Sequence, residues 1–334
     1  MITTKYSIPY EVFKFSGQSK IEVWQLYCRL RNMGWAAYSK WLVDELPLCL
    51  QRVRELADSF PFWQRRAKTG RPPTPERDLL IAFLVRTFFD STFSQTEMLL
   101  KLFQPLFDMR KIPDSTTLSR KNRSKRWIHL WKRFHKFVMD KLPKRKATIA
   151  TDATGWGAYL RSWSDTPYDV RACQNWVKVH ASMEVDSNFI LSYKLTPSNV
   201  HESQVFEDVW EAIPENVDPS ASLADGSYSG LKCLMVAKAK EATPYHGIRK
   251  DAMFVLKPTN QYQKMVNFAR HFPNRFCEKY SKRAQIESAF GAMKKSLGYR
   301  IRCRTERGRK NEVQAKISAH NIKGLAQLHF MCTK

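Results

Sequence analysis

The order of strands and helices predicted after Lys146 restricts this chain to one broad class of fold. The predicted strands are short and apolar, and they cover residues 147–151, 176–185, 189–195, 221–224 and 252–256. The helices predicted between and after them cover residues 205–213, 231–239 and 279–297. Three successive strands followed by alternating helices and strands predict a mixed sheet of five strands with flanking helices. We therefore expect an α/β domain over residues 146–334.

Residues 1–145 instead have the pattern of an all-helical region. Apolar residues three and four positions apart predict helices at 21–35 and 38–60. A Gly-Arg-Pro-Pro sequence at 70–73 then interrupts the pattern. We therefore expect a helical N-terminal domain in front of the α/β domain.

Three further helices with short connections are predicted after that interruption. They are expected to cover residues 79–89, 94–103 and 115–141. Their expected N-terminal caps are Thr74, Ser94 in a capping box with Glu97, and Asp114. Three helices of which the last is long and basic resemble a helix-turn-helix unit, although many helical bundles share this pattern. The sequence thus predicts a DNA-binding or dimerisation region over residues 1–145.

Positive charge is concentrated in two segments. The 334 residues include 56 Lys and Arg against 31 Asp and Glu, which gives a net charge of +25. Residues 110–146 contain fourteen basic residues and two acidic ones, and residues 264–310 contain fourteen against three. One interpretation is a solvated surface, and the other, favoured by aromatic residues among the charges, is contact with a phosphate backbone. The candidate DNA contacts are Arg120, Lys121, Arg123, Lys125 and Arg126, with Arg300, Arg302 and Arg304 in an arginine-rich stretch.

The composition and the apolar runs exclude several classes of protein. With 43% hydrophobic residues the chain can bury a core, which excludes general disorder. The strongest apolar run, residues 79–89, is interrupted by Arg86 and is shorter than the roughly 20 residues that cross a membrane. Met1 leads into no continuous apolar segment. We expect a soluble cytoplasmic protein without a membrane partner.

Three acidic residues stand where predicted strands end or a helix packs. Asp152 ends the first predicted strand, Asp225 ends the fourth, and Glu287 lies on the last predicted helix. Strand ends at one edge of an open sheet form sites, and a helix across them can add a third carboxylate. Such a cluster can hold two Mg²⁺ ions, which activate one oxygen and stabilise another in phosphoryl transfer. In the alternative interpretation, either aspartate only caps a turn.

The helix that carries Glu287 has a polar stripe beside an apolar one. At about 100° per residue, four polar residues share a stripe about 60° wide, namely Tyr280, Arg283, Glu287 and Lys294. The apolar stripe predicts packing on the sheet. The polar stripe can offer a carboxylate to metal ions and two cations and a phenol to DNA phosphates. Alternatively, Arg283 and Glu287 form only a surface ion pair.

The spacing of these four residues resembles the Y-R-E-K signature of the DDE transposases of bacterial and archaeal insertion sequences. The sequence Ala-Asp-Gly-Ser-Tyr-Ser around Asp225 is similar to the motif with the second acid of that family, including an aromatic residue at Tyr228.

Two upstream segments strengthen the resemblance. Residues 199–203, Asn-Val-His-Glu-Ser, resemble a segment that precedes the second acid, with Glu202 in place of the usual aspartate and Ser198 in place of the usual glycine. Residues 113–120 resemble an N-terminal motif of the same transposases.

The resemblance implies an RNase H-like catalytic domain in which Asp152, Asp225 and Glu287 are catalytic and hold two Mg²⁺ ions, with Mn²⁺ as a substitute. It implies hydrolysis that exposes a 3′-hydroxyl at each transposon end, followed by attack of that hydroxyl on target DNA. Tyr280, Arg283 and Lys294 would hold terminal phosphates. The implied partner is double-stranded DNA, both the terminal inverted repeats and the target, and joining two ends predicts a homodimer.

Several alternatives remain open at this point. His201 is a candidate to support a metal ligand, or it caps a helix or lies in the core. Four aromatic residues after Asp152 either stack on DNA bases or pack internally, namely Trp156, Tyr159, Trp163 and Tyr168. A DNA-binding protein without strand transfer, such as a repressor or a domesticated transposase, and a plain metal-dependent nuclease of the same fold are the alternative functions.

Overall fold

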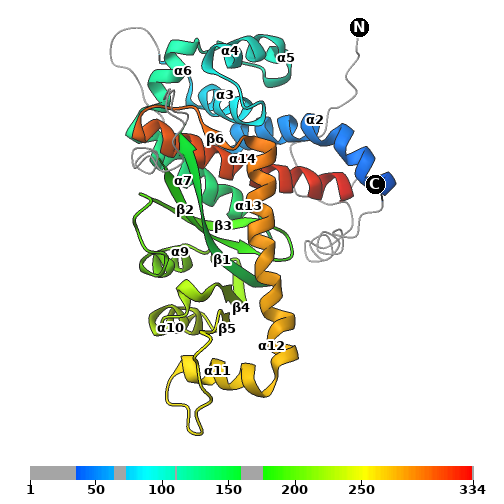
Figure 1. The fold of residues 1–334 in the computed structure, drawn as a ribbon. Helices are drawn as coiled ribbons and strands as arrows, with labels where there is room; N and C mark the ends of the chain where they lie inside the picture. The colour runs from blue at the N-terminus through cyan, green and yellow to red at the C-terminus, as the bar shows by residue number, and fades with distance from the viewer. Residues whose placement is uncertain (1–34, 64–72, 110, 159–175, 333–334) are drawn as a thin grey trace.

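The computed structural model describes residues 35–63, 73–109, 111–158 and 176–332. A β-sheet lies in the middle of the molecule in Figure 1, with most N-terminal helices at one end and α11 (Gln261–His271) at the other. The helix predicted at 21–35 lies outside the described residues except for its last one, and Tyr159, Trp163 and Tyr168 lie outside them as well.

The main path of the sheet has the strand order β3-β2-β1-β4-β5. The strands are β1 (Arg145–Ala158), β2 (Val177–Glu184), β3 (Ile190–Thr196), β4 (Val217–Ala224) and β5 (Thr243–His246). β2 pairs antiparallel with both β1 and β3, whereas β4 lies parallel to β1 and β5 parallel to β4. A short strand, β6 (Arg300–Ile301), pairs with the last residues of β1. This arrangement confirms the predicted mixed α/β sheet with a helical region before it.

The prediction of the fifth strand at 252–256 is wrong. The apolar side chains there face solvent, since Met253 is 81% exposed and Leu256 is 90% exposed. The fifth strand is β5, in which Pro244 removes a backbone donor and obscures the pattern of a strand. Proline is tolerated because β5 is the last strand on the main path and pairs along one side, with Thr243 opposite Ala221.

The region before the sheet is helical, as predicted. Its helices are α2 (Trp35–Ser59), α3 (Glu76–Phe88), α4 (Phe93–Leu102), α5 (Gln104–Phe107), α6 (Ser115–Asn122) and α7 (Lys125–Asp140). Two predicted caps are wrong, because the N-cap of α3 is Pro75 rather than Thr74, and the capping box of α4 joins Thr92 and Gln95 rather than Ser94 and Glu97. Glu97 instead accepts a hydrogen bond from the Ser115 backbone at 2.9 Å.

The single long basic helix predicted from 115 to 141 is also wrong, because α6 and α7 are separate. Asp114 caps α6 as predicted, accepting from the Thr117 backbone at 2.7 Å. A new cap at Ser124 then opens α7. The break is held by Asn122, whose carbonyl accepts from Asn311 at 2.7 Å and whose amide donates to the Gly308 carbonyl at 3.2 Å. Contacts with a distant helix therefore end α6 where the local sequence permits continuation.

That distant helix is α14 (Glu306–Cys332), which packs against α2, α3 and α7. Figure 1 shows α14 among the N-terminal helices although it follows the sheet in the chain. One hydrophobic cluster joins residues of the helical region, the sheet and α14, including Phe83, Trp131, Ile149, Leu223 and Ile317. The helices on both sides of residue 145 thus share a core, and the division of the chain at that residue stays a prediction.

The three helices predicted after the third strand flank the sheet. The predicted helices at 205–213 and 231–239 are confirmed as α9 (Phe206–Glu211) and α10 (Leu231–Ala239). The predicted helix at 279–297 is interrupted, because α12 (Pro273–Tyr280) ends before a 3₁₀ turn, η4 (Ser281–Arg283), and α13 (Ala284–Leu297) begins after it. Figure 1 shows α13 running along the sheet beside β1, to which it is packed.

Candidate active site

Asp152 and Asp225 lie next to each other because β1 and β4 are parallel neighbours. The last residues paired between the two strands are Thr151 and Ala224. Asp152 and Asp225 are the residues that directly follow this pair. Asp225 ends β4 as predicted and caps η3 (Gly226–Tyr228), accepting from the Ser227 backbone at 2.9 Å. β1 does not end at Asp152 as predicted, because β2 and then β6 continue to pair with it.

The turn that carries Asp225 is fixed from the side of β5. Burial lowers the pKa of His246 to about 4, so its neutral ring donates from Nδ1 to the Tyr228 carbonyl at 2.9 Å and accepts from Ser222 at 2.8 Å. The next residue, Gly247, approaches the turn so closely that a Cβ there would lie 2.5 Å from the Gly226 nitrogen. The position of Asp225 therefore depends on the edge strand as well as on β4.

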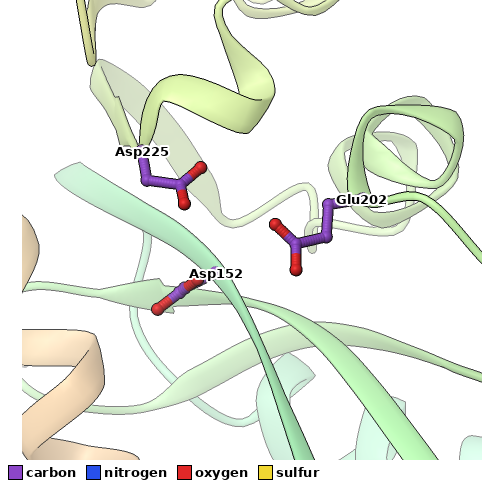
Figure 2. A group of neighbouring side chains, drawn as sticks. All are labelled: Asp152, Glu202 and Asp225. Atoms are coloured by element: carbon purple, nitrogen blue, oxygen red, sulfur yellow. The ribbon is translucent and has the colours of Figure 1, made fainter. Parts of the chain in front are cut away.

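A third carboxylate, that of Glu202, lies beside the two aspartates. Among the described residues, Asp152, Glu202 and Asp225 each offer one oxygen within 4.8 Å of the others. Figure 2 shows them on three separate segments of the chain, with the side chains of Asp225 and Glu202 turned toward each other. Glu202 begins η2 (Glu202–Gln204), a 3₁₀ turn between β3 and α9. The sequence did not predict Glu202 as a site residue. Its only signal was its place as the acidic residue of the Asn-Val-His-Glu-Ser segment at 199–203.

Two neighbours hold Glu202 in place. The Lys178 ammonium lies 3.1 Å from Glu202 Oε1, and the Ser227 hydroxyl donates to Oε2 at 2.6 Å. The same hydroxyl also lies within hydrogen-bonding distance of Asp225. A serine hydroxyl has one proton, so it serves one of these two carboxylates at a time.

Burial and charge affect the acids of this cluster differently. Burial raises the pKa of Asp152 to about 6, and the charges of Asp225 and Glu202 add to this while the Ala153 backbone and Arg283 oppose it. Burial also tends to raise the pKa of Glu202, but its bonds to Ser227 and Lys178 outweigh this and lower the pKa below its ordinary value. The Ala153 backbone and Arg283 therefore stabilise the ionised form of Asp152 by less than burial and the neighbouring acids destabilise it.

Glu287, the third predicted acid, lies apart from this cluster and contacts Arg283. The Arg283 Nη1 atom is 2.7 Å from Glu287 Oε1 and 3.9 Å from Asp152 Oδ2. The Glu287 side chain is 53% exposed, whereas the Asp152 side chain is 14% exposed. The structure thus brings together two of the three predicted acids. It also contains the Arg283–Glu287 ion pair of the alternative interpretation, with the guanidinium between Glu287 and Asp152.

The two other residues of the polar stripe are held by neighbouring side chains. Tyr280 stacks on Phe276 at a ring distance of 5.7 Å. Lys294 donates to the Thr154 hydroxyl at 2.7 Å, two residues beyond Asp152 on β1, and lies 5.1 Å from the ring centre of Trp156. Trp156 is fully buried in β1, so the packing interpretation is confirmed for this aromatic residue.

Tyr228 and His201 flank the acidic cluster. Tyr228 is fully buried, and its hydroxyl has no hydrogen-bond partner among the described residues. Burial, followed by the charges of Glu202, Asp152 and Asp225, raises the pKa of that hydroxyl. The exposed side chain of His201 caps η2 by accepting from the Ser203 backbone at 3.3 Å, so the capping interpretation is confirmed.

The candidate DNA contacts of the first basic segment lie around the turn between α6 and α7. Arg120, Arg123 and Lys125 are exposed, and Lys121 is half-buried. Arg126 is engaged within the protein, because it pairs with Glu76. In the part of the chain that the structure describes, the exposed members of this group form no ion pair with an acid, so they can turn to a phosphate backbone.

The arginine-rich stretch is attached to the helical region. Arg302 forms two bonds with Asp90, at 3.0 and 3.2 Å, whereas Arg300 and Arg304 are exposed. Glu312 of α14 accepts from the backbones of Arg302 and Cys303 at 3.0 and 3.1 Å. It also pairs with buried Arg86 of α3 at 3.3 Å. The stretch that follows α13 is therefore anchored rather than a solvated loop.

A cluster of carboxylates on the edge of a strongly basic protein suits the chemistry of phosphates. The acids attract hard divalent cations, and the surrounding arginines and lysines attract the phosphate groups of a nucleic acid. Arg283 belongs to both environments because it is a cation of the polar stripe that contacts two acids. None of the helices in the described ranges is long and apolar enough to cross a membrane.

Comparison of the sequence with protein families agrees with this geometry. Residues 143–322, more than half of the chain, match a protein-family model described as a transposase DDE domain. The matched range begins just before β1 and ends within α14, so it contains the acidic cluster and the whole of α13. A search of the curated proteins finds no match to this chain.

Proposed function

Because this chain belongs to the DDE transposase family, we propose that it cleaves the ends of a mobile element and joins their 3′-hydroxyl groups to target DNA. Family membership makes the chain a metal-dependent enzyme with an RNase H-like fold that acts on DNA. The observation that carries the finer proposal is the approach of Asp152 and Asp225 at the adjoining ends of parallel strands. Beside them, α13 presents Glu287.

The residues present fit divalent cations. Their donors are carboxylate oxygens, which Mg²⁺ prefers, and those of Asp152 and Asp225 lie within 4.8 Å of each other, with an oxygen of Glu202 equally close. Asp152, Asp225 and Glu287 would hold two Mg²⁺ ions, or Mn²⁺ in their place. Bound ions of this kind stabilise the charge on attacking and departing oxygens in phosphoryl transfer.

Arg283 regulates the position of Glu287 in this proposal. In the structure it forms the 2.7 Å ion pair with Glu287 and lies 3.9 Å from Asp152. A DNA phosphate is a competing partner for a guanidinium, because it accepts two parallel hydrogen bonds. When Arg283 turns to a terminal phosphate, Glu287 is released beside Asp152. Tyr280 and Lys294, on the same side of the site, bind neighbouring phosphates.

The helical region supplies recognition of the DNA ends. Arg120, Lys121, Arg123 and Lys125 surround the turn between α6 and α7, and we assign them to contacts with the terminal inverted repeats. The exposed residues Arg300 and Arg304 extend the basic surface next to α13. Two DNA ends must meet before joining, so the active assembly is a homodimer with one end bound to each subunit.

The test uses the full chain, labelled duplex DNA that carries the inverted repeats flanking the gene, a target plasmid and Mg²⁺. Wild-type protein is expected to cleave at the repeat and to join the 3′ end to the plasmid, and Glu287→Gln is expected to do neither. Cleavage without a joined product would indicate a plain nuclease. Tight binding without cleavage by either protein would indicate a DNA-binding protein and would refute the proposal.

A further inference from the structure

Glu202 has no role in the proposed reaction, yet it is closer to the two aspartates than Glu287 is. Its oxygen lies within 4.8 Å of those of Asp152 and Asp225, and Glu287 is held outside this group by Arg283. The only cation that contacts Glu202 among the described residues is Lys178, at 3.1 Å. Within the described ranges, Arg283 is the cation that pairs with Asp152, at 3.9 Å. Three carboxylates therefore share little positive charge.

The hydrogen bonds within the group are also incomplete. Ser227 lies between Glu202 and Asp225, but its single proton satisfies one of them at a time. Asp152 accepts from the Ala153 backbone at 2.8 Å, which occupies one of its two oxygens. The second oxygen of Asp152 accepts no hydrogen bond from the described residues and is not buried away from solvent, so a cation can reach it.

An independent observation comes from Tyr228, the last residue of the turn that Asp225 caps. Its side chain is fully buried, and its hydroxyl is without a hydrogen-bond partner in the described part of the chain. Tyr228 ends the turn that Asp225 caps, and its ring lies 5.5 Å from that of Phe206, at the start of the helix that follows η2, so the phenol lies between the segments that carry Asp225 and Glu202. A buried phenol without a partner costs about 1–3 kcal/mol. Its donor is available to a carboxylate oxygen, or to a water carried by a cation.

We propose that Glu202 is a ligand of a divalent cation held together with Asp152 and Asp225, and that the Tyr228 hydroxyl donates into this site. The inference deepens the proposed function and rests on it for the identity of the reaction. In this proposal, the protein without DNA binds one cation through Asp152, Asp225 and Glu202. Glu287 binds metal only after Arg283 has turned from it to a DNA phosphate.

Binding of Mn²⁺ to the full chain without DNA tests the assignment. The electron paramagnetic resonance signal of free Mn²⁺ measures how much remains unbound during titration. Glu202→Gln keeps an oxygen that accepts from Ser227 but removes the charge, and it is expected to weaken Mn²⁺ binding at least about tenfold. Glu207→Gln is the matched control, because Glu207 lies on α9 and pairs with Lys232 at the surface, and it is expected to bind like wild type. Glu202→Gln that binds Mn²⁺ like wild type, while Asp152→Asn does not, would overturn the proposal.

Tyr228→Phe provides a second variant that retains the ring packed against Phe206 at 5.5 Å. It is expected to weaken Mn²⁺ binding several-fold without lowering the melting temperature of the unloaded protein. Unchanged Mn²⁺ affinity in this variant would refute the part assigned to the hydroxyl. Cleavage of DNA by wild-type protein is measured separately, so cleavage together with normal Mn²⁺ binding by Glu202→Gln refutes this inference alone. Mn²⁺ binding that depends on Glu202 without any cleavage refutes the proposed function alone.

Discussion

Replacing Asp152 with asparagine should stabilise the protein in the absence of metal at neutral pH. The Asp152 carboxylate is largely buried beside Asp225 and Glu202, and its pKa is about 6 in the folded protein against an ordinary value of 3.8. Asparagine removes the charge and keeps an oxygen that accepts from the Ala153 backbone, as Asp152 does at 2.8 Å. The cost of burying the charge is therefore removed with little change in hydrogen bonding.

The size and the sign of the effect follow from the two pKa values. A difference of about two pH units corresponds to about 3 kcal/mol of folding free energy. Because the pKa is higher in the folded state, wild-type protein loses stability as the pH rises from about 4 to about 6, and the whole cost is present above that range. The advantage of the variant should be about 3 kcal/mol at pH 7 and about 0.5 kcal/mol at pH 4. For a chain of this length it corresponds to roughly 4 °C at pH 7.

Thermal unfolding of the two proteins in a metal chelator, at pH 4 and pH 7, measures this difference. Asp218→Asn is the matched control, since Asp218 is half-exposed, 3.7 Å from Lys144 and outside the cluster. The control should remain within about 0.5 kcal/mol of wild type at both pH values. A melting temperature of Asp152→Asn at or below that of wild type at pH 7, or an equal gain at both pH values, would show that burial of this charge carries no such cost.

Three other predictions concern the metal, the DNA and the core. Mg²⁺ at 100 times its Kd should stabilise wild-type protein by about 2.7 kcal/mol in thermal unfolding but leave Asp152→Asn nearly unchanged, and equal stabilisation of both would place the ion elsewhere. Arg283→Gln should reduce by about 1 the magnitude of the slope of log K against log salt for terminal DNA, and an unchanged slope would exclude a phosphate contact. Arg86→Met should cost about 3–5 kcal/mol in urea unfolding because Glu312 stays buried without its cation, and a loss below about 1 kcal/mol would contradict this.

The part of the site that the sequence predicts is the part built from local patterns. Apolar runs indicate where β1 and β4 lie, and the order of the elements makes them parallel neighbours, so Asp152 and Asp225 meet. The helical period likewise places Arg283 and Glu287 one turn apart, and their ion pair is formed. Each of these relations depends on residues close in sequence or on strands that adjoin.

The part that the sequence does not predict depends on contacts between distant segments. Glu202 joins the cluster because η2 lies beside the turn after β4, where Ser227 donates to it. No helical or strand periodicity in the sequence predicts this contact. Asp90 and Arg302 are 212 positions apart, so the anchoring of the arginine-rich stretch has no local signal. Pro244 made β5 hard to predict, because proline is accepted mainly in edge strands. Which strand lies at the edge is determined by the tertiary structure.

The position of α14 among the N-terminal helices has a consequence for synthesis of the chain. Helices α2, α3 and α7 leave the ribosome long before α14, which completes the hydrophobic cluster that they share. At about 5–20 residues per second, roughly 10–40 s separate the end of α7 from the completion of α14. During that interval the apolar faces of the early helices lack their final partner, and the acidic residues of the sheet are translated in the meantime. The basic helices before the sheet therefore reach their final packing only after α14 has been translated.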